Sequence, residues 1–88
     1  MTSFTREEIN LIHKLWIHTC FGKGHMLIDN LVKGFPSHLK GLMKNDIENL
    51  VRKNILIKKS TRHGYAVYIN VDHRVMIERE LKKHFGLL

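Results

Sequence analysis

The hydrophobic pattern changes its period just after Asn54, and this change constrains the fold of the 88-residue chain more than any other feature. Before it, apolar residues recur at the spacing of one helix face, at Met43, Ile47, Leu50 and Val51. After it come a β-branched run over 55–57, a basic, turn-rich stretch over 58–64 that interrupts it, and strict alternation over 65–70. This order predicts a helix that leads directly into a two-stranded β-hairpin.

The returning strand of this hairpin has two different faces. Alternation places Tyr65, Val67 and Ile69 on one face and Ala66, Tyr68 and Asn70 on the other. At the preceding junction, Lys53 supplies a cation to the helix end, and Asn54 tolerates the left-handed conformation that often ends a helix.

Three further helices are predicted around this unit. The first spans about 5–20, because Thr5 and Glu8 form a capping-box pattern ahead of an apolar stripe that contains Ile9, Ile12 and Leu15. A short second helix over 25–33 ends at Gly34, with Pro36 just beyond. The last helix spans about 73–86, is capped by Asp72, and carries an apolar stripe of Ile77, Leu81, Phe85 and Leu88.

The start of the third helix, the one before the hairpin, is left open by the pattern. Its apolar stripe begins near Leu42, and residues 37–41 form either a loop or a first helical turn.

A hydrophobic fraction of 43% with 26% charged residues is typical of a globular protein, and the length suits one domain over 1–88. The expected architecture is α/β, mostly α, with three helices, a basic hairpin and a C-terminal helix.

The excess positive charge is concentrated in the middle of the chain. Between Lys33 and Arg62, eight Lys and Arg side chains face only Asp46 and Glu48, which leaves +6 of the total +7. Such a concentration attracts polyanions and releases counterions when phosphates bind. A solvated surface with no partner is the simpler alternative.

Residues 47–58, Ile-Glu-Asn-Leu-Val-Arg-Lys-Asn-Ile-Leu-Ile-Lys, resemble the end of the recognition helix and the first wing strand of the winged helix-turn-helix family. Residues 63–68, His-Gly-Tyr-Ala-Val-Tyr, resemble the wing tip and the returning strand. The resemblance covers 26–70, with Asn54 where many members have Gly, and residues 35–38 lengthen the turn before the third helix. A short strand often precedes the second helix in such folds, and residues 24–26 could pair there.

This resemblance implies binding of duplex DNA, with a recognition helix at about 41–53 in the major groove and a wing at 55–70 along the backbone or minor groove. A transcriptional regulator or a chromatin-type accessory protein would fit. Winged modules that bind RNA or other proteins within a larger complex are the alternative. The residues expected to contact nucleic acid are Ser37, His38, Lys40, Lys44, Asn45, Lys58, Lys59, Thr61, Arg62 and His63.

Other functions have weaker support in the sequence. His13 and His18 stand five residues apart, which does not align them on a helix, so no metal site and no cofactor are expected despite Cys20 and His25 nearby. Catalytic motifs are absent, so no enzymatic activity is expected. The sequence favours a cytoplasmic protein that does not enter membranes. It has one cysteine, and it lacks both an apolar run of about 20 residues and a signal-peptide pattern.

Apolar residues in the two terminal helices raise the question of a homodimer. They exceed what one small core obviously needs, and comprise Ile17, Phe21, Met76, Ile77 and Leu88. Pairing of terminal helices would present two recognition helices to one duplex. Filling of the core is an equally good interpretation.

Overall fold

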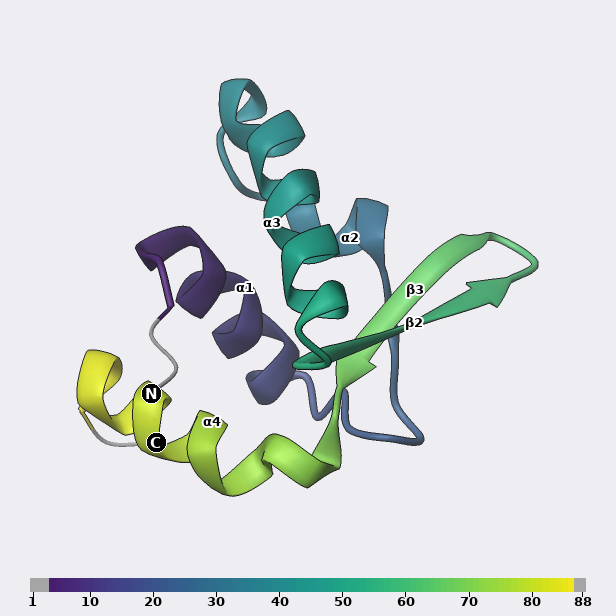
Figure 1. Cartoon of the computed structure of the whole chain (residues 1–88). Coiled ribbons are helices and arrows are strands. Elements are labelled where there is room, and N and C mark those ends of the chain that lie inside the picture. The colour runs from purple at the N-terminus through teal and green to yellow at the C-terminus, as the bar shows by residue number, and fades with distance from the viewer. Residues whose placement is uncertain (1–3, 87–88) are drawn as a thin grey trace.

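Figure 1 shows the computed structural model of the chain, which describes residues 4–86. This part is mixed α/β and mostly helical, as expected. Its elements are α1 (Arg6–Ile17), β1 (Met26–Leu27), α2 (Ile28–Val32), the 3₁₀-helix η1 (Ser37–Leu39), α3 (Lys40–Arg52), β2 (Leu56–Thr61), β3 (Gly64–Ile69), the 3₁₀-helix η2 (Val71–His73) and α4 (Arg74–Phe85).

The three strands form one antiparallel sheet in the order β1-β3-β2. The predicted hairpin is confirmed, with Leu56 opposite Ile69 at its base and Thr61 opposite Gly64 at its tip. The strand that the resemblance allowed at residues 24–26 is found slightly later, where Met26 and Leu27 pair with β3 on its other edge. This pairing supplies partners for backbone groups of β3 that would otherwise form an open edge.

Helix α1 is central to the core. It contacts α2, α3, α4 and β3, and in Figure 1 it lies between α3 and α4. The side chains of Leu11, Ile12 and Leu15 are fully buried, as are Ile47 and Leu50 on the facing side of α3. One hydrophobic core therefore holds the helices and the base of the hairpin together.

Several local signals in the sequence are confirmed. Thr5 and Glu8 form the capping box: the Glu8 N–H donates to Thr5 Oγ1 over 3.1 Å, and the Thr5 N–H donates to Glu8 Oε1 over 2.9 Å. Asn54 has a φ of 63° after α3, and Gly34 has a φ of 93° after α2. Both residues turn the chain in the left-handed region, as expected.

The first two helices are shorter than predicted. Helix α1 ends at Ile17 rather than near residue 20, because the chain reverses at Thr19, whose φ is 53°. Gly24 lies against this turn, where a Cβ would come within 2.7 Å of the Thr19 carbonyl oxygen. The helix expected over 25–33 is reduced to α2, because its first residues belong to β1.

The boundaries of the later elements also differ. Helix α3 begins at Lys40 after η1, so the first-turn interpretation of 37–41 is the right one. Strand β2 continues to Thr61 rather than breaking at Lys58, because its basic residues pair in register with β3. The prediction that Asp72 caps the last helix is wrong: the Asn70 side chain caps η2 by accepting a hydrogen bond from the Asp72 N–H.

The apolar residues that suggested a dimer have several different environments. Ile77 is fully buried, and Phe21 and Met76 pack partly against the core, so these three contribute to the core of a single chain. Ile17 is 58% exposed, and Leu88 lies outside the described residues. In residues 4–86, helices are too short or too polar to cross a bilayer.

Lys14 ties α1 to the segment that precedes α3. Its ammonium group donates to the backbone oxygens of Asn30, Leu31 and Lys33 over 3.0, 3.1 and 2.7 Å, where α2 ends. Burial, and then the charge of Lys33, lower the pKa of Lys14. This contact supplies donors to carbonyls that a helix end leaves without partners, and it helps to place the turn into α3.

We therefore expect Lys14→Met to destabilise the fold by about 1 to 2 kcal/mol, because three carbonyl oxygens lose a charged donor and only some regain one from water. Urea unfolding followed by circular dichroism measures the effect. Lys82→Met is the matched control, because Lys82 makes only an exposed ion pair with Glu78. Equal stability losses in the two variants would show that the contact of Lys14 with α2 contributes nothing.

Candidate nucleic-acid interface

Helix α3 has one buried and one exposed face. Met43, Ile47 and Leu50 are buried in the core, whereas Lys44 and Asn45 are exposed on the other side. In Figure 1 the N-terminal end of α3 projects away from the other helices, and the hairpin extends beside its C-terminal half. Burial of the apolar stripe thus determines which side chains of α3 face outward.

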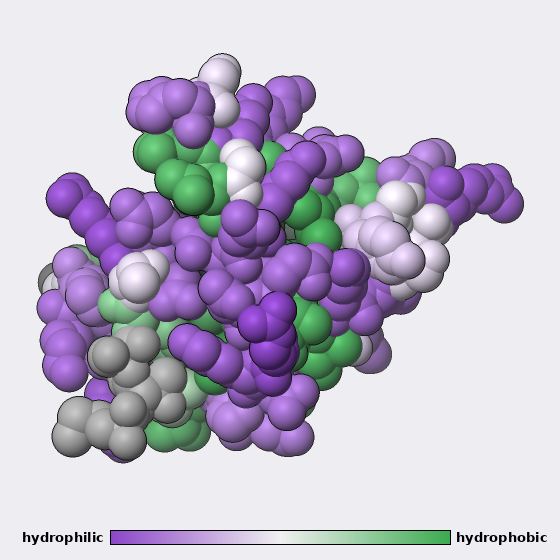
Figure 2. Space-filling model, turned by 45° about the horizontal axis from the view of Figure 1, so that its top comes forward, coloured by the Kyte–Doolittle hydropathy of each residue, from purple (hydrophilic) through white to green (hydrophobic). Residues whose placement is uncertain are grey.

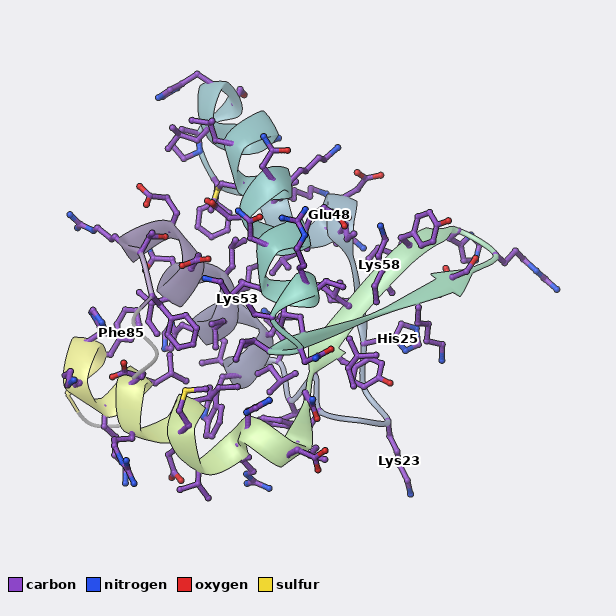
Figure 3. All side chains as sticks on the ribbon, in the orientation of Figure 1. Lys23, His25, Glu48, Lys53, Lys58 and Phe85 are labelled. Atoms are coloured by element: carbon purple, nitrogen blue, oxygen red, sulfur yellow. The ribbon has the colours of Figure 1, made fainter. Side chains whose placement is uncertain are left out.

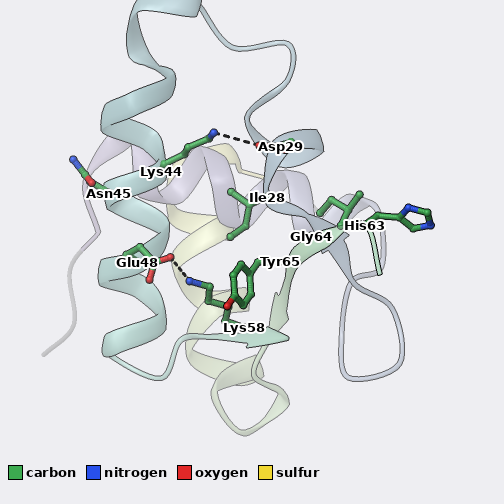
Figure 4. A pocket seen from close by; sticks show the side chains of 10 residues that line it. Ile28, Asp29, Lys44, Asn45, Glu48, Lys58, His63, Gly64 and Tyr65 are labelled. Carbon is green, nitrogen blue, oxygen red and sulfur yellow. Dashed lines mark hydrogen bonds and ion pairs between the residues drawn. The ribbon is translucent and has the colours of Figure 1, made fainter. Parts of the chain in front are cut away.

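A groove of about 300 Å³ lies between α3, the start of α2 and the hairpin. Figure 4 shows the polar side chains of α3 on one side and those of the hairpin on the other. The residues that line it are Leu27, Ile28, Asp29, Lys44, Asn45, Glu48, Lys58, His63, Gly64 and Tyr65. Four of the ten expected contact residues, Lys44, Asn45, Lys58 and His63, are therefore brought together.

Each lysine of this groove is paired with a carboxylate. Lys44 Nζ lies 3.2 Å from Asp29 Oδ1, and Lys58 Nζ donates to Glu48 Oε1 over 2.7 Å. The Lys58 ammonium also lies 4.4 Å from the centre of the Tyr65 ring. The two cations and two anions balance, so the groove itself carries little net charge.

The other expected residues of the hairpin have different surroundings. Lys59 is exposed, but strand alternation places its side chain on the face opposite Lys58. Thr61 is engaged within the tip, where its hydroxyl donates to the Gly64 oxygen over 2.6 Å and accepts from the His63 N–H over 3.2 Å. Arg62 is exposed at the turn of the hairpin.

Three expected residues lie at the opposite end of α3. Ser37 and His38 are exposed in η1, and Lys40 is half-buried at the first turn of α3. The face shown in Figure 2 is mostly hydrophilic over α3 and the end of the hairpin, with its apolar areas small and separate. Four of the ten residues thus line a groove whose charges balance, and the other six lie around it, rather than all ten forming one uniformly basic patch.

Sequence reasoning missed the acidic and aromatic members of the groove. Glu48 stands four residues after Lys44 and three after Asn45, a helical spacing that could have placed it on the same exposed face. Tyr65 pairs with Ser60, two residues from Lys58 on the same face of the hairpin, so register could have indicated their contact. Asp29 gives no such signal, because it reaches Lys44 only through the tertiary fold.

Negative charge also collects on the side of α3 that faces α1. Burial raises the pKa of Asp46, and the nearby carboxylates of Glu8 and Glu7 raise it further. Lys53 Nζ lies 4.0 Å from Glu8 Oε2, on this side rather than toward the groove. In the view of Figure 3, Lys58 points toward Glu48, whereas His25 and Lys23 lie beyond the other side of the hairpin.

The histidines and the cysteine were the remaining candidates for a site. Within residues 4–86, three or more His, Cys, Asp or Glu side chains nowhere gather in a way that could hold a metal ion. Cys20 is buried in the core, which raises the pKa of its thiol. His13 stacks on Phe85, with ring centres 4.1 Å apart.

Comparison with family models, curated proteins and solved structures found no match to this chain.

The charge cluster around Asp46 generates a prediction of pH dependence. Because the folded state raises the pKa of Asp46, its contribution to stability is favourable below the unfolded-state pKa and is lost as the pH rises through the folded-state pKa. We expect Asp46→Asn to raise the melting temperature at neutral pH, and to have a smaller effect near pH 3, below the unfolded-state pKa of about 4. Thermal unfolding across this range tests it, and an equal gain at both values would contradict the assignment.

Proposed function

We propose that the protein binds duplex DNA as a winged helix-turn-helix domain, with α3 as the recognition helix and the β2–β3 hairpin as the wing. The observation that carries the proposal is the exposed polar face of α3 beside the hairpin, with Lys44 and Lys58 reaching into the groove between them and Asn45 and His63 at its edges (Figure 4). In this arrangement α3 would enter the major groove and the hairpin would follow the backbone or the minor groove.

The dimensions of α3 support this proposal. A helix of 13 residues is about 20 Å long and about 10–12 Å across with its side chains. The major groove of B-DNA, at about 12 Å wide, admits such a helix. The first turns of α3 project clear of the other helices, so a duplex could approach them (Figure 1).

The charge distribution supports contact with a phosphate backbone. Lys59 and Arg62 on the hairpin and Lys40 on α3 have no carboxylate partner among the ion pairs of residues 4–86. Arg62 at the hairpin tip and Lys40 in the first turn of α3 lie on two sides of the groove, and Lys59 lies on the outer face of the hairpin, so each would meet a phosphate of the backbone. Because Lys44 and Lys58 are already paired, these outer cations would provide most of the electrostatic attraction.

The same charge would attract RNA, which remains the alternative partner together with another protein. The deep, narrow major groove of A-form RNA excludes a helix, whereas that of B-DNA admits one. The exposed length of α3 therefore favours DNA over double-stranded RNA. A transcriptional regulator or a chromatin-type accessory protein would have this activity. A cytoplasmic location fits the single buried thiol of Cys20, because thiols stay reduced there.

A competition titration tests the proposal directly. Labelled duplex DNA bound to the full chain is displaced by unlabelled duplex DNA or by a structured RNA over a range of salt concentrations. We expect DNA to compete better, and we expect a slope of about −5 for log affinity against log salt if roughly six phosphates are neutralised. Better competition by RNA, or no binding near physiological salt, would favour the alternative.

The outer cations of the hairpin generate a second prediction. We expect Lys59→Ala with Arg62→Ala to weaken binding to all sequences and to reduce the magnitude of the salt slope by about 2, because two phosphate contacts are lost. Lys82→Ala with Lys83→Ala on α4 is the control of equal charge, since both lysines are exposed and lie far along the chain from the groove. An unchanged slope in the hairpin variant would remove the hairpin from the interface.

A further inference from the structure

The position of Glu48 is unusual for a surface that binds a polyanion. Its side chain is 46% exposed and lies in the groove beside Asn45 and Lys44, on the outward face of α3. A carboxylate here repels phosphates, so it weakens binding to any duplex unless it gains a specific contact. A groove that served only to attract phosphates would not place an acidic residue at this point.

Lys58 holds this carboxylate in one orientation. Its ammonium group donates to Glu48 Oε1 over 2.7 Å, and it is kept in place by the Tyr65 ring at 4.4 Å. Lys58 is the less exposed partner, at 29%, and is engaged on both sides, so it is poorly placed to reach a phosphate. The hydrogen bonds found in residues 4–86 leave Glu48 Oε2 without a donor, so this oxygen has room for one.

The edges of DNA bases offer hydrogen-bond donors that could fill the free position on Glu48 Oε2. In the major groove, cytosine presents its N4 amino group, and a carboxylate accepts from it. Adenine pairs best with an amide such as that of Asn45, which both donates and accepts. A carboxylate has acceptors only, so among the four bases it is matched best by cytosine.

We propose that Glu48 is a specificity-determining residue that selects cytosine by accepting a hydrogen bond from its N4 amino group through Oε2. Lys58 is a positioning residue, which orients Glu48 and offsets its charge without contacting a phosphate. This inference rests on the proposed binding of duplex DNA. In this scheme the groove recognises the base sequence, and the outer cations Lys40, Lys59 and Arg62 provide the attraction to the DNA backbone.

Selection from a library of duplexes with a randomised centre tests the inference, using the full wild-type chain and the Glu48→Gln variant. We expect one position of the wild-type site to prefer cytosine over adenine by at least about 5-fold in dissociation constant. In Glu48→Gln the preference at that position should change to adenine, because the amide supplies both a donor and an acceptor. Glu78→Gln on α4 removes an exposed, lysine-paired carboxylate of the same kind and should leave the preference unchanged.

A second variant distinguishes positioning from phosphate contact. We expect Lys58→Met to reduce the preference for cytosine while the salt slope stays that of the wild type. A smaller slope would show that Lys58 contacts a phosphate and would overturn its assigned role. If Glu48→Gln tightened binding to all duplexes equally and left the preferred sequence unchanged, Glu48 would act by repulsion alone. That result would overturn the inference and leave duplex binding intact, whereas a wild-type chain that bound no duplex would overturn the proposed function itself.

Discussion

The burial of one side of α3 is the constraint on which the rest of the structure depends. The residues buried on this side are Met43, Ile47 and Leu50, and each is at most 1% exposed. Since these residues repeat at helical spacing, their burial leaves the intervening residues, Lys44 and Asn45 among them, on the outer side. The same core holds the base of the hairpin, so the position of β2 relative to α3 follows from apolar packing rather than from the polar contacts across the groove.

Polar contacts add further links between the helices and the hairpin that apolar packing has placed. Lys14 holds the end of α2 through three carbonyl oxygens, and Lys58 joins the hairpin to Glu48 of α3. Two lysines of a basic protein are thus used inside the fold or across its groove. The formal charge of +7 already counts such pairs, so what matters for a polyanion is which cations lack a carboxylate partner. Near the groove, among residues 4–86, these include Lys40, Lys59 and Arg62.

Much of the fold was predictable because its signals are local. The capping box of Thr5 and Glu8, the left-handed turn at Asn54 and the alternation of β3 each depend on residues close in the chain. The short strand β1 was expected only from the resemblance, at residues 24–26, and the residues themselves did not locate it, because two residues carry no period and their pairing with β3 is tertiary. The cap at Asp72 was misplaced for another reason: Asn70 offers an equivalent side chain two residues earlier.

For the candidate site, counting charges identified the segment but not the partners of its residues. The contact of Asp29 with Lys44 depends on how α2 packs beside α3 and cannot be inferred from spacing. The opposite orientation of Lys58 and Lys59 follows from strand alternation once β2 is known to continue past them. Lysine count alone therefore overstates how many cations one surface presents.

The most direct test of the account is a map of amide chemical shifts in the isotope-labelled chain as a short DNA duplex is added. We expect the largest changes on the outer face of α3, around Lys44, Asn45 and Glu48, and at the hairpin tip near Arg62. Helix α4 should change little. Changes concentrated on α4, or no changes at any concentration of duplex, would contradict the claim that α3 and the hairpin form the surface that binds DNA.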